Sequence, residues 1–160
     1  MKEIQLTQGK VALVDDEDFE NLNQFKWYAN RCRSIFYAHR EINSHRDNRK
    51  IIHMHRCLIG QEENMFVDHI DGNGLNNQKS NLRPCTNRQN LMNRRPNKNA
   101  SSVYKGVNYY KYQNKKYISF IKTNEKKIYI GSFDTEIEAA KAYDEKAKEH
   151  FGEFAWLNFP

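Results

Sequence analysis

The chain has 160 residues, with 26 lysines and arginines against 20 aspartates and glutamates and a formal net charge of +6. This length allows one ordinary domain or two small ones. The positive balance favours an anionic partner such as a polynucleotide, although a merely soluble basic protein would show the same balance. Cys32, Cys57 and Cys85 lie too far apart to predict a disulfide framework or a four-cysteine zinc site.

The amino-terminal residues lack the apolar run of a signal peptide. No stretch approaches the roughly 20 apolar residues that cross a bilayer. We therefore expect a cytoplasmic protein that has no membrane partner.

Residues 2–59 alternate short β-like runs with polar turns, and the runs cover residues 4–6, 11–14, 35–42 and 51–55. Acidic side chains are favoured at helix starts, so the cluster at residues 15–18 predicts a short helix through Phe19, Leu22 and Phe25. The charged stretch at residues 45–50 predicts a loop, with two interpretations, a solvated hairpin tip or a phosphate contact.

Residues 65–95 carry the pattern with the most chemical content. The apolar run 65–67 predicts a strand that brings Asp68 and His69 to its end, and residues 71–74, Asp-Gly-Asn-Gly, predict a turn. Residues 81–85 predict a return strand. Thr86 and Gln89 have the spacing of a capping box, which predicts a helix that Pro96 ends. The predicted unit is strand, loop, strand and helix.

The pair Asp68-His69 suits a metal ligand beside a base. A carboxylate is a hard oxygen ligand, and an ordinary histidine pKa near ~6.5 leaves a neutral fraction that accepts a proton at cellular pH. Mg²⁺ prefers oxygen donors and keeps several waters, so a site with few protein ligands stays open to phosphate oxygens. An Asp-His pair by itself is equally compatible with a polar turn.

Asp68-His69, Asn81 and Asn90 stand in the order and approximate spacing of a known motif. The segment resembles the HNH endonucleases of the His-Me finger group, particularly the homing enzymes of phages and mobile introns. Asparagine replaces the last histidine, as in many homing members. The resemblance implies that His69 is the general base, that Asp68 and Asn90 bind one Mg²⁺ or Mn²⁺, and that Asn81 braces the loop. It also implies a ββα-metal core.

Residues 101–160 change pattern to three β-like runs, at 105–112, 117–122 and 127–130, followed by one helix. Thr135 and Glu138 form a second capping box, and the alanines of the helix would let it lie close to a sheet. Lysines and tyrosines gather in or beside the strands, whereas acidic residues dominate the helical part. The sheet is therefore the predicted polyanion surface, with alternate side chains facing inward.

Tyr104-Lys105-Gly106-Val107, residues 130–135, residues 138–144 and the closing residues 157–160 carry a second resemblance. The block is similar to the Apetala and ethylene-response-factor type of DNA-binding domain, found in plant regulators and phage homing endonucleases. This family docks its sheet in the major groove. The resemblance implies DNA contacts from these residues: Lys105, Asn108, Tyr110, Lys111, Lys122 and Tyr129. Because the block has no arginine, its DNA preference should differ from that of the plant members.

We therefore expect an α+β protein with three parts: a β-rich segment and nuclease module (1–95), a basic tether (96–102) and a DNA-binding domain (103–160). Arg94, Arg95 and Lys98 in and before the tether should follow a phosphate backbone. The predicted function is site-specific nicking of double-stranded DNA by a monomer in a bacterial or phage-infected cell, with a dimer on DNA as the alternative.

Two rival interpretations remain at this stage. One is a DNA-binding regulator whose central fold is catalytically silent. The other takes His53, His55 and Cys57 as zinc ligands that strand alternation brings to one face, with Cys32 or Cys85 as the fourth ligand.

Overall fold

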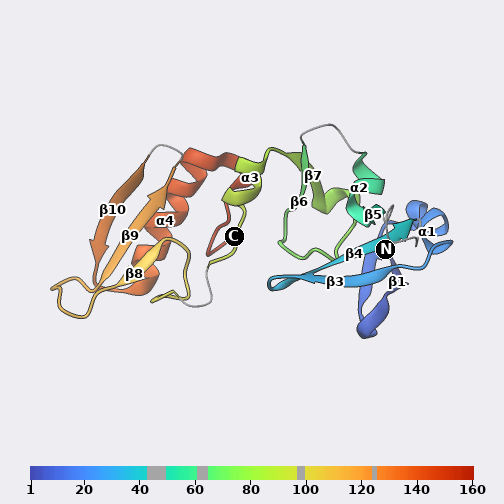
Figure 1. Ribbon diagram of the computed structural model, residues 1–160. Coiled ribbons are helices and arrows are strands. Elements are labelled where there is room, and N and C mark those ends of the chain that lie inside the picture. Colours follow the sequence, from blue (N-terminus) through green and yellow to red (C-terminus); the bar gives the residue numbers. More distant parts are fainter. Residues whose placement is uncertain (43–49, 61–64, 97–99, 124–125) are drawn as a thin grey trace. The chain divides into compact units, whose positions relative to one another are not determined.

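The computed structural model describes residues 1–42, 50–60, 65–96, 100–123 and 126–160. It is an α+β structure of small antiparallel sheets and helices, which confirms the predicted class (Figure 1). The chain divides into two compact units, Met1–Asn90 and Leu91–Pro160. No helix in the described ranges is long and apolar enough to cross a membrane. The predicted charged stretch at 45–50 lies, except for Lys50, outside the described residues.

The described residues of the first unit form three antiparallel sheets, with the strand orders β1-β2, β3-β4-β5 and β6-β7. Its strands are β1 (Lys2–Gln5), β2 (Val11–Val14), β3 (Tyr28–Cys32), β4 (Ile35–Ile42), β5 (Lys50–His53), β6 (Phe66–His69) and β7 (Leu82–Cys85). Its helices are α1 (Asp16–Asn23), α2 (Met54–Ile59) and the start of α3 (Asn87–Met92), with 3₁₀ turns η1 (Thr7–Gly9) and η2 (Lys79–Asn81).

The core of the first unit lies among β1, β2, α1, α2 and the β3–β4 hairpin. Ile4, Val14, Trp27 and Met54 are each at most 2% exposed. The Trp27 indole N–H donates to the Leu22 carbonyl at 2.8 Å, so the one polar atom of this large side chain is paired. The acidic cluster does open helix α1, as predicted, but the helix ends at Asn23 and does not include Phe25.

Helix α2 corrects the prediction of a strand through residues 51–55. Strand β5 ends at His53, and α2 begins at Met54. The Met54 side chain is fully buried in the core, and α2 contacts β4, β5, β6 and β7. Burial of one helix face therefore outweighs the β-like sequence pattern. Strand β3 was also absent from the predicted runs.

The predicted order of strand, loop, strand and helix is confirmed by β6, β7 and α3. Asp68 pairs with Arg83 and His69 with Leu82 across the β6–β7 hairpin. The Thr86 backbone N–H donates to Gln89 Oε1 at 2.8 Å, and the Gln89 N–H donates to Thr86 Oγ1 at 3.2 Å, which confirms the capping box. Helix α3 ends at Met92, earlier than the predicted stop at Pro96.

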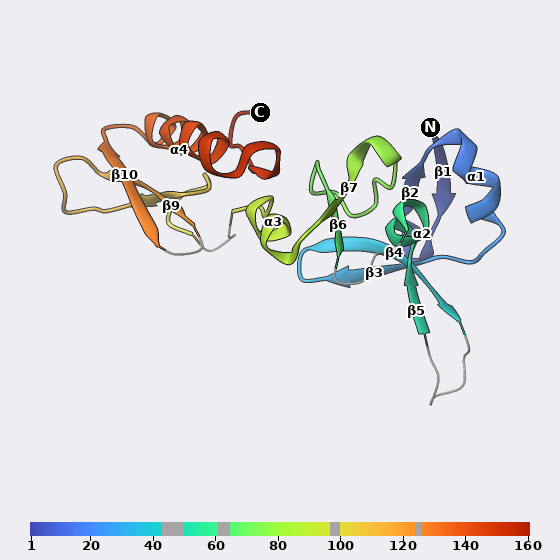
Figure 2. The same cartoon turned by 90° about the horizontal axis from the view of Figure 1, so that it is seen from above.

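The second unit is a three-stranded antiparallel sheet, in the order β10-β9-β8, covered on one face by helix α4 (Figures 1 and 2). Its elements are β8 (Val107–Tyr109), β9 (Tyr117–Lys122), β10 (Lys127–Phe133), α4 (Glu136–Phe151) and the 3₁₀ turn η3 (Gly152–Phe154). The capping box of Thr135 and Glu138 is present. Ala139, Ala140 and Ala147 are fully buried, so the small helix residues do allow a close approach to the sheet.

Gly106 permits the closest of these approaches. Its φ of +80° is in the left-handed region, and a Cβ there would lie 1.9 Å from the Tyr143 ring. The buried Asp144 carboxylate accepts hydrogen bonds from the backbone N–H groups of Asn158 and Phe159. Asn158 in turn bonds both backbone groups of Lys105. These contacts join the first residues of the sheet domain to its last.

Candidate active site

Asp68 and His69 end strand β6, and both side chains are buried, with exposed fractions of 4% and 5%. The Arg83 guanidinium donates twice to Asp68 Oδ2, from Nε at 3.0 Å and from Nη2 at 2.8 Å. Burial without a counter-charge would be costly for either group, so the pair holds both side chains in place. A carboxylate has about four lone-pair positions, so the same side chain retains the chemistry of a metal ligand.

The His69 imidazole contacts the side chain of Asn77. His69 Nε2 lies 3.4 Å from Asn77 Oδ1. Burial lowers the pKa of His69, and the opposing effects of Asn77, Asp71 and Asp68 are smaller. The imidazole is therefore neutral at pH 7, which is the state that a proton acceptor needs.

Asn81 is buried beneath the loop between β6 and β7. Its Oδ1 accepts the Asp71 N–H at 3.0 Å, while its Nδ2 donates to Asp71 Oδ1 at 3.0 Å and to the Asn76 carbonyl at 2.8 Å. The same loop passes against β4 at Gly74, where a Cβ would lie 2.6 Å from the Tyr37 ring. The loop that follows His69 therefore has a fixed path.

Asn90, the predicted second metal ligand, belongs to helix α3, which follows β7. Cys85 at the end of β7 is fully buried, and its pKa is raised to about 11, first by burial and then by the Asp68 carboxylate. A hydrogen bond with the Asn90 backbone acts in the opposite direction on the same thiol.

Aromatic and imidazole rings surround His69. The His55 ring stands edge-on to the His69 ring, with their centroids 5.1 Å apart. The centroid of the Tyr37 ring lies 5.8 Å from that of His69 and 5.9 Å from that of His55. His53 stacks on the other side of His55 at 5.3 Å. Burial, with smaller effects from His69, His53 and Arg56, lowers the pKa of His55 to about 3. His55 is therefore neutral at physiological pH.

The zinc interpretation of His53, His55 and Cys57 is wrong. It required all three on one strand, but His55 and Cys57 belong to α2, and Cys57 is exposed. Within the described ranges, no three His, Cys, Asp or Glu side chains form a metal-holding group.

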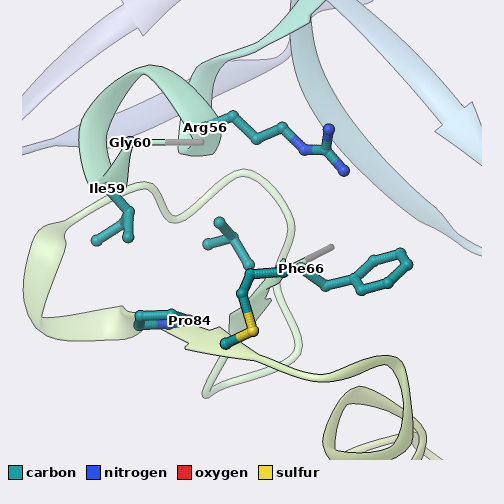
Figure 3. A pocket seen from close by; sticks show the side chains of 7 residues that line it. Arg56, Ile59, Gly60, Phe66 and Pro84 are labelled. Carbon is teal, nitrogen blue, oxygen red and sulfur yellow. The ribbon is translucent and has the colours of Figure 1, made fainter. Parts of the chain in front are cut away.

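Helix α2 instead packs on the β6–β7 hairpin and carries His55 to His69. A small pocket lies between the end of α2 and this hairpin, lined in part by Ile59, Gly60 and Pro84 (Figure 3). The Arg56 side chain extends from α2 to the same side as the Phe66 ring, away from Ile59 and Pro84 (Figure 3).

The residues predicted to contact DNA in the second unit can be assigned to one of the two faces of its sheet or to the loop beyond it. Val107 and Ser119 are buried on the α4 side, so Asn108, Phe120 and Lys122 project from the opposite face. The Tyr129 ring contacts Phe120 at 5.6 Å, and Lys127 Nζ lies 3.8 Å from the Phe120 ring centroid. Tyr110 and Lys111 are exposed beyond β8.

A groove in this unit runs from the tether to that face. It is lined by Arg94, Arg95 and Pro96 and by sheet residues that include Asn108, Lys122 and Lys127. Arg95 also lies over the Trp156 ring at 5.3 Å. Lys98 lies outside the described residues.

Lys105 differs from the other predicted contacts. Its ammonium donates to the Met92 carbonyl, and burial lowers its pKa to about 8. The side chain therefore ties the end of helix α3 to the sheet domain within this unit and is not presented on the outer sheet face.

Comparison with known proteins decides the family. Residues 60–92 match the HNH endonuclease family model. An uncharacterised HNH endonuclease, L560, of Acanthamoeba polyphaga mimivirus is 33% identical over 153 residues, which cover 94% of this chain and 76% of the relative. The chain belongs to the HNH endonuclease family. No solved structure matches it.

Sequence reasoning about this HNH endonuclease missed three residues that contact the site. Arg83 pairs with Asp68, Asn77 bonds His69, and His55 packs on His69. A hairpin register that placed Arg83 opposite Asp68 would have revealed the ion pair. Asn77 gave only an indirect signal, as one of several amides in a loop that the prediction treated as a turn.

Proposed function

We propose that this HNH endonuclease is a site-specific, metal-dependent enzyme of the homing type that nicks double-stranded DNA. The observation that supports the proposal is the placement of buried Asp68 and His69 at the end of strand β6, which a loop, strand β7 and helix α3 with Asn90 follow. This arrangement suits a ββα-metal core of the His-Me finger type. A single site per chain favours cleavage of one strand.

His69 acts as the general base. Its burial keeps the ring neutral, so it accepts a proton from the water that attacks the scissile phosphorus. Asn81 braces the loop through its bonds to Asp71 and Asn76, and this holds the end of β6 in place. The products are a 5′-phosphate and a 3′-hydroxyl if the chemistry follows the family.

Asp68 and Asn90 would hold one divalent ion, Mg²⁺ or Mn²⁺. A carboxylate and an amide oxygen are the donors that these hard cations prefer, and so few protein ligands leave room for phosphate oxygens. When bound, the ion neutralises charge that develops on the phosphoryl group. Arg83 orients the Asp68 carboxylate through Oδ2.

The second unit selects the site as a DNA-binding domain of the Apetala and ethylene-response-factor type. Its outer sheet face carries Asn108, Lys122 and Tyr129, with Tyr110 and Lys111 beyond β8. Arg94 and Arg95 extend the positive charge along the groove, and Lys127 is added to the predicted contacts. Lys105 is removed from them because its ammonium is bound within the unit.

One observation favours the rival function, a catalytically silent DNA-binding regulator. The Arg83 guanidinium already neutralises the Asp68 carboxylate, as it would in a fold that had lost its metal. A nicking assay on supercoiled plasmid, with and without Mg²⁺, separates the two. Nicking that needs the metal supports the enzyme, whereas DNA binding without nicking supports the regulator.

A random DNA library incubated with the protein and Mg²⁺ tests the specificity. Sequencing of the cut ends should return one preferred sequence with breaks at a fixed position in one strand. Breaks spread over unrelated sequences would contradict a site-specific enzyme.

A further inference from the structure

Only one orientation of the buried Asn77 side-chain amide lets both its oxygen and its nitrogen form hydrogen bonds. The side chain belongs to a residue that is 1% exposed, and its Nδ2 donates to the Leu75 carbonyl at 3.2 Å. Oδ1 is therefore the atom that faces His69 Nε2 at 3.4 Å. Because an amide oxygen only accepts hydrogen bonds, the His69 nitrogen must be the donor.

This contact determines the tautomer of the neutral His69 ring. With its proton on Nε2, a neutral imidazole has Nδ1 as its basic nitrogen. The other tautomer would set two lone pairs against each other in a buried place, which is costly. Asn77 thereby selects the nitrogen that accepts the proton.

Strand β2 holds the Asn77 backbone in place from the far end of the sequence. The Asn77 N–H donates to the Leu13 carbonyl at 2.8 Å, and the Leu13 N–H donates to the Leu75 carbonyl at 2.9 Å. The next loop residues are held by Asp15, whose carboxylate accepts from the Lys79 N–H at 2.8 Å and from Gln78 Nε2 at 3.2 Å. The amino-terminal hairpin therefore fixes the loop that carries Asn77.

The rings of His55 and Tyr37 support the same orientation of His69 by packing. His55 meets His69 at an interplanar angle of 86° and Tyr37 meets it at 59°. Within the described residues, His55 Nδ1 has no hydrogen-bond partner. His55 and Tyr37 contact His69 by ring packing, and this packing restricts rotation of the His69 ring.

We propose that Asn77 is a positioning residue for the reaction, because it fixes the Nε2–H tautomer of His69. The amino-terminal β1–β2 hairpin contributes by holding the Asn77 backbone in place. The proposal rests on the proposed role of His69 as general base. The amino-terminal hairpin, which contributes no residue to the central motif, would then support catalysis by fixing the loop that carries Asn77.

The test is nitrogen NMR of the full chain labelled in its histidine rings. The wild-type spectrum at alkaline pH, compared with that of His69→Gln for assignment, should show the His69 proton on Nε2. A proton on Nδ1 in the wild type would overturn the proposal. This measurement needs neither DNA nor catalysis, so it is informative even if the protein does not cut DNA.

Two variants of one position separate tautomer control from bulk packing. Asn77→Leu keeps the size but loses the acceptor, and it should yield a mixture of tautomers. The single-turnover cleavage rate should fall about 10–100-fold, as for other residues that orient a reactive group through a hydrogen bond, with DNA affinity unchanged. Asn77→Asp keeps an acceptor oxygen but loses the bond to Leu75, and it should retain the proton on Nε2. Unchanged tautomer and rate in Asn77→Leu would contradict the proposal, as would loss of the Nε2–H tautomer in Asn77→Asp.

Discussion

The polar side chains of the candidate active site in the first unit and those of the outer sheet face in the second unit differ in their burial. Around His69, the groups proposed to carry the chemistry are buried and each is held by a neighbour, as Asp68 is by Arg83 and Asn81 is by Asp71. On the outer face of the β8–β10 sheet, Lys122 and Tyr129 are exposed to solvent. A reacting group needs one orientation before the substrate arrives, whereas a surface that binds a polyanion gains by leaving its cations accessible.

The largest expected effect separates catalysis from binding. Replacing His69 with alanine removes the proposed base and should lower the cleavage rate by about 10²–10⁴-fold. Binding of uncut DNA, measured without Mg²⁺, should stay as in the wild type. His150→Ala, which changes an exposed histidine on α4, is the matched control. Undiminished cleavage by His69→Ala would remove the mechanism.

The buried ion pair should dominate the stability of the first unit. Arg83→Met leaves the Asp68 carboxylate buried without its partner and should lower the free energy of unfolding by about 3–5 kcal/mol. Arg88→Met, at an exposed position in α3, should change it little. Urea unfolding of the two variants measures the difference. Equal stabilities would show that Arg83 is not what holds Asp68.

Acid should destabilise the first unit through its histidines. The unfolded chain protonates His55 near pH 6.5, but the folded pKa is about 3, so protons bind the unfolded state preferentially between these values. The free energy of unfolding should therefore fall as the pH drops through this window, by up to about 5 kcal/mol for His55 alone. Burial also lowers the pKa values of His53 and His69, which act in the same direction.

His55→Phe keeps a flat ring and removes the titration, so unfolding measured across this pH range should depend less steeply on pH than in the wild type. His150→Phe provides the exposed control. Identical pH profiles for His55→Phe and the wild type would contradict the assignment of the low pKa to His55.

The smallest expected effects belong to the exposed sheet face. Replacing Lys122 and Lys127 together with glutamine should weaken DNA binding, and each lost phosphate contact should lower the slope of log affinity against log salt by about 1. The cleavage rate at saturating DNA should not change. Lys141 and Lys148 on α4 are exposed on the helix and serve as the control pair. Equal losses of affinity in both pairs would mean that the sheet face is not the binding surface.

Local signals in the sequence predicted much of the fold. Both capping boxes formed, and the third block gave three strands and one alanine-rich helix, because turn residues and period-two alternation act within a few residues. Helix α2 was missed because its sequence continues a β-like run. The burial of Met54 against distant strands, which no local pattern reveals, decides its conformation.

The same holds for the candidate site: its residues within one segment were predicted, whereas the contacts that depend on distant segments were not. The candidate residues Asp68, His69, Asn81 and Asn90 were proposed from a motif within one segment and its resemblance to HNH endonucleases, and their roles remain predictions. The residues that hold them could not, since Arg83 depends on the hairpin register and Asn77 on a hydrogen bond with β2, more than sixty positions earlier in the chain. The helix α2 side chain beside His69 was likewise assigned to a different metal site.

The most direct test of the central claim is diffraction from crystals of the protein with DNA and Mn²⁺, recorded at the manganese absorption edge. Mn²⁺ should give one anomalous peak per chain, bonded to a carboxylate oxygen of Asp68 and the side-chain oxygen of Asn90, with the His69 ring facing the adjacent phosphate. A peak bonded to other residues, or Asp68 and Asn90 side chains pointing apart with no ion between them, would contradict the proposed enzyme.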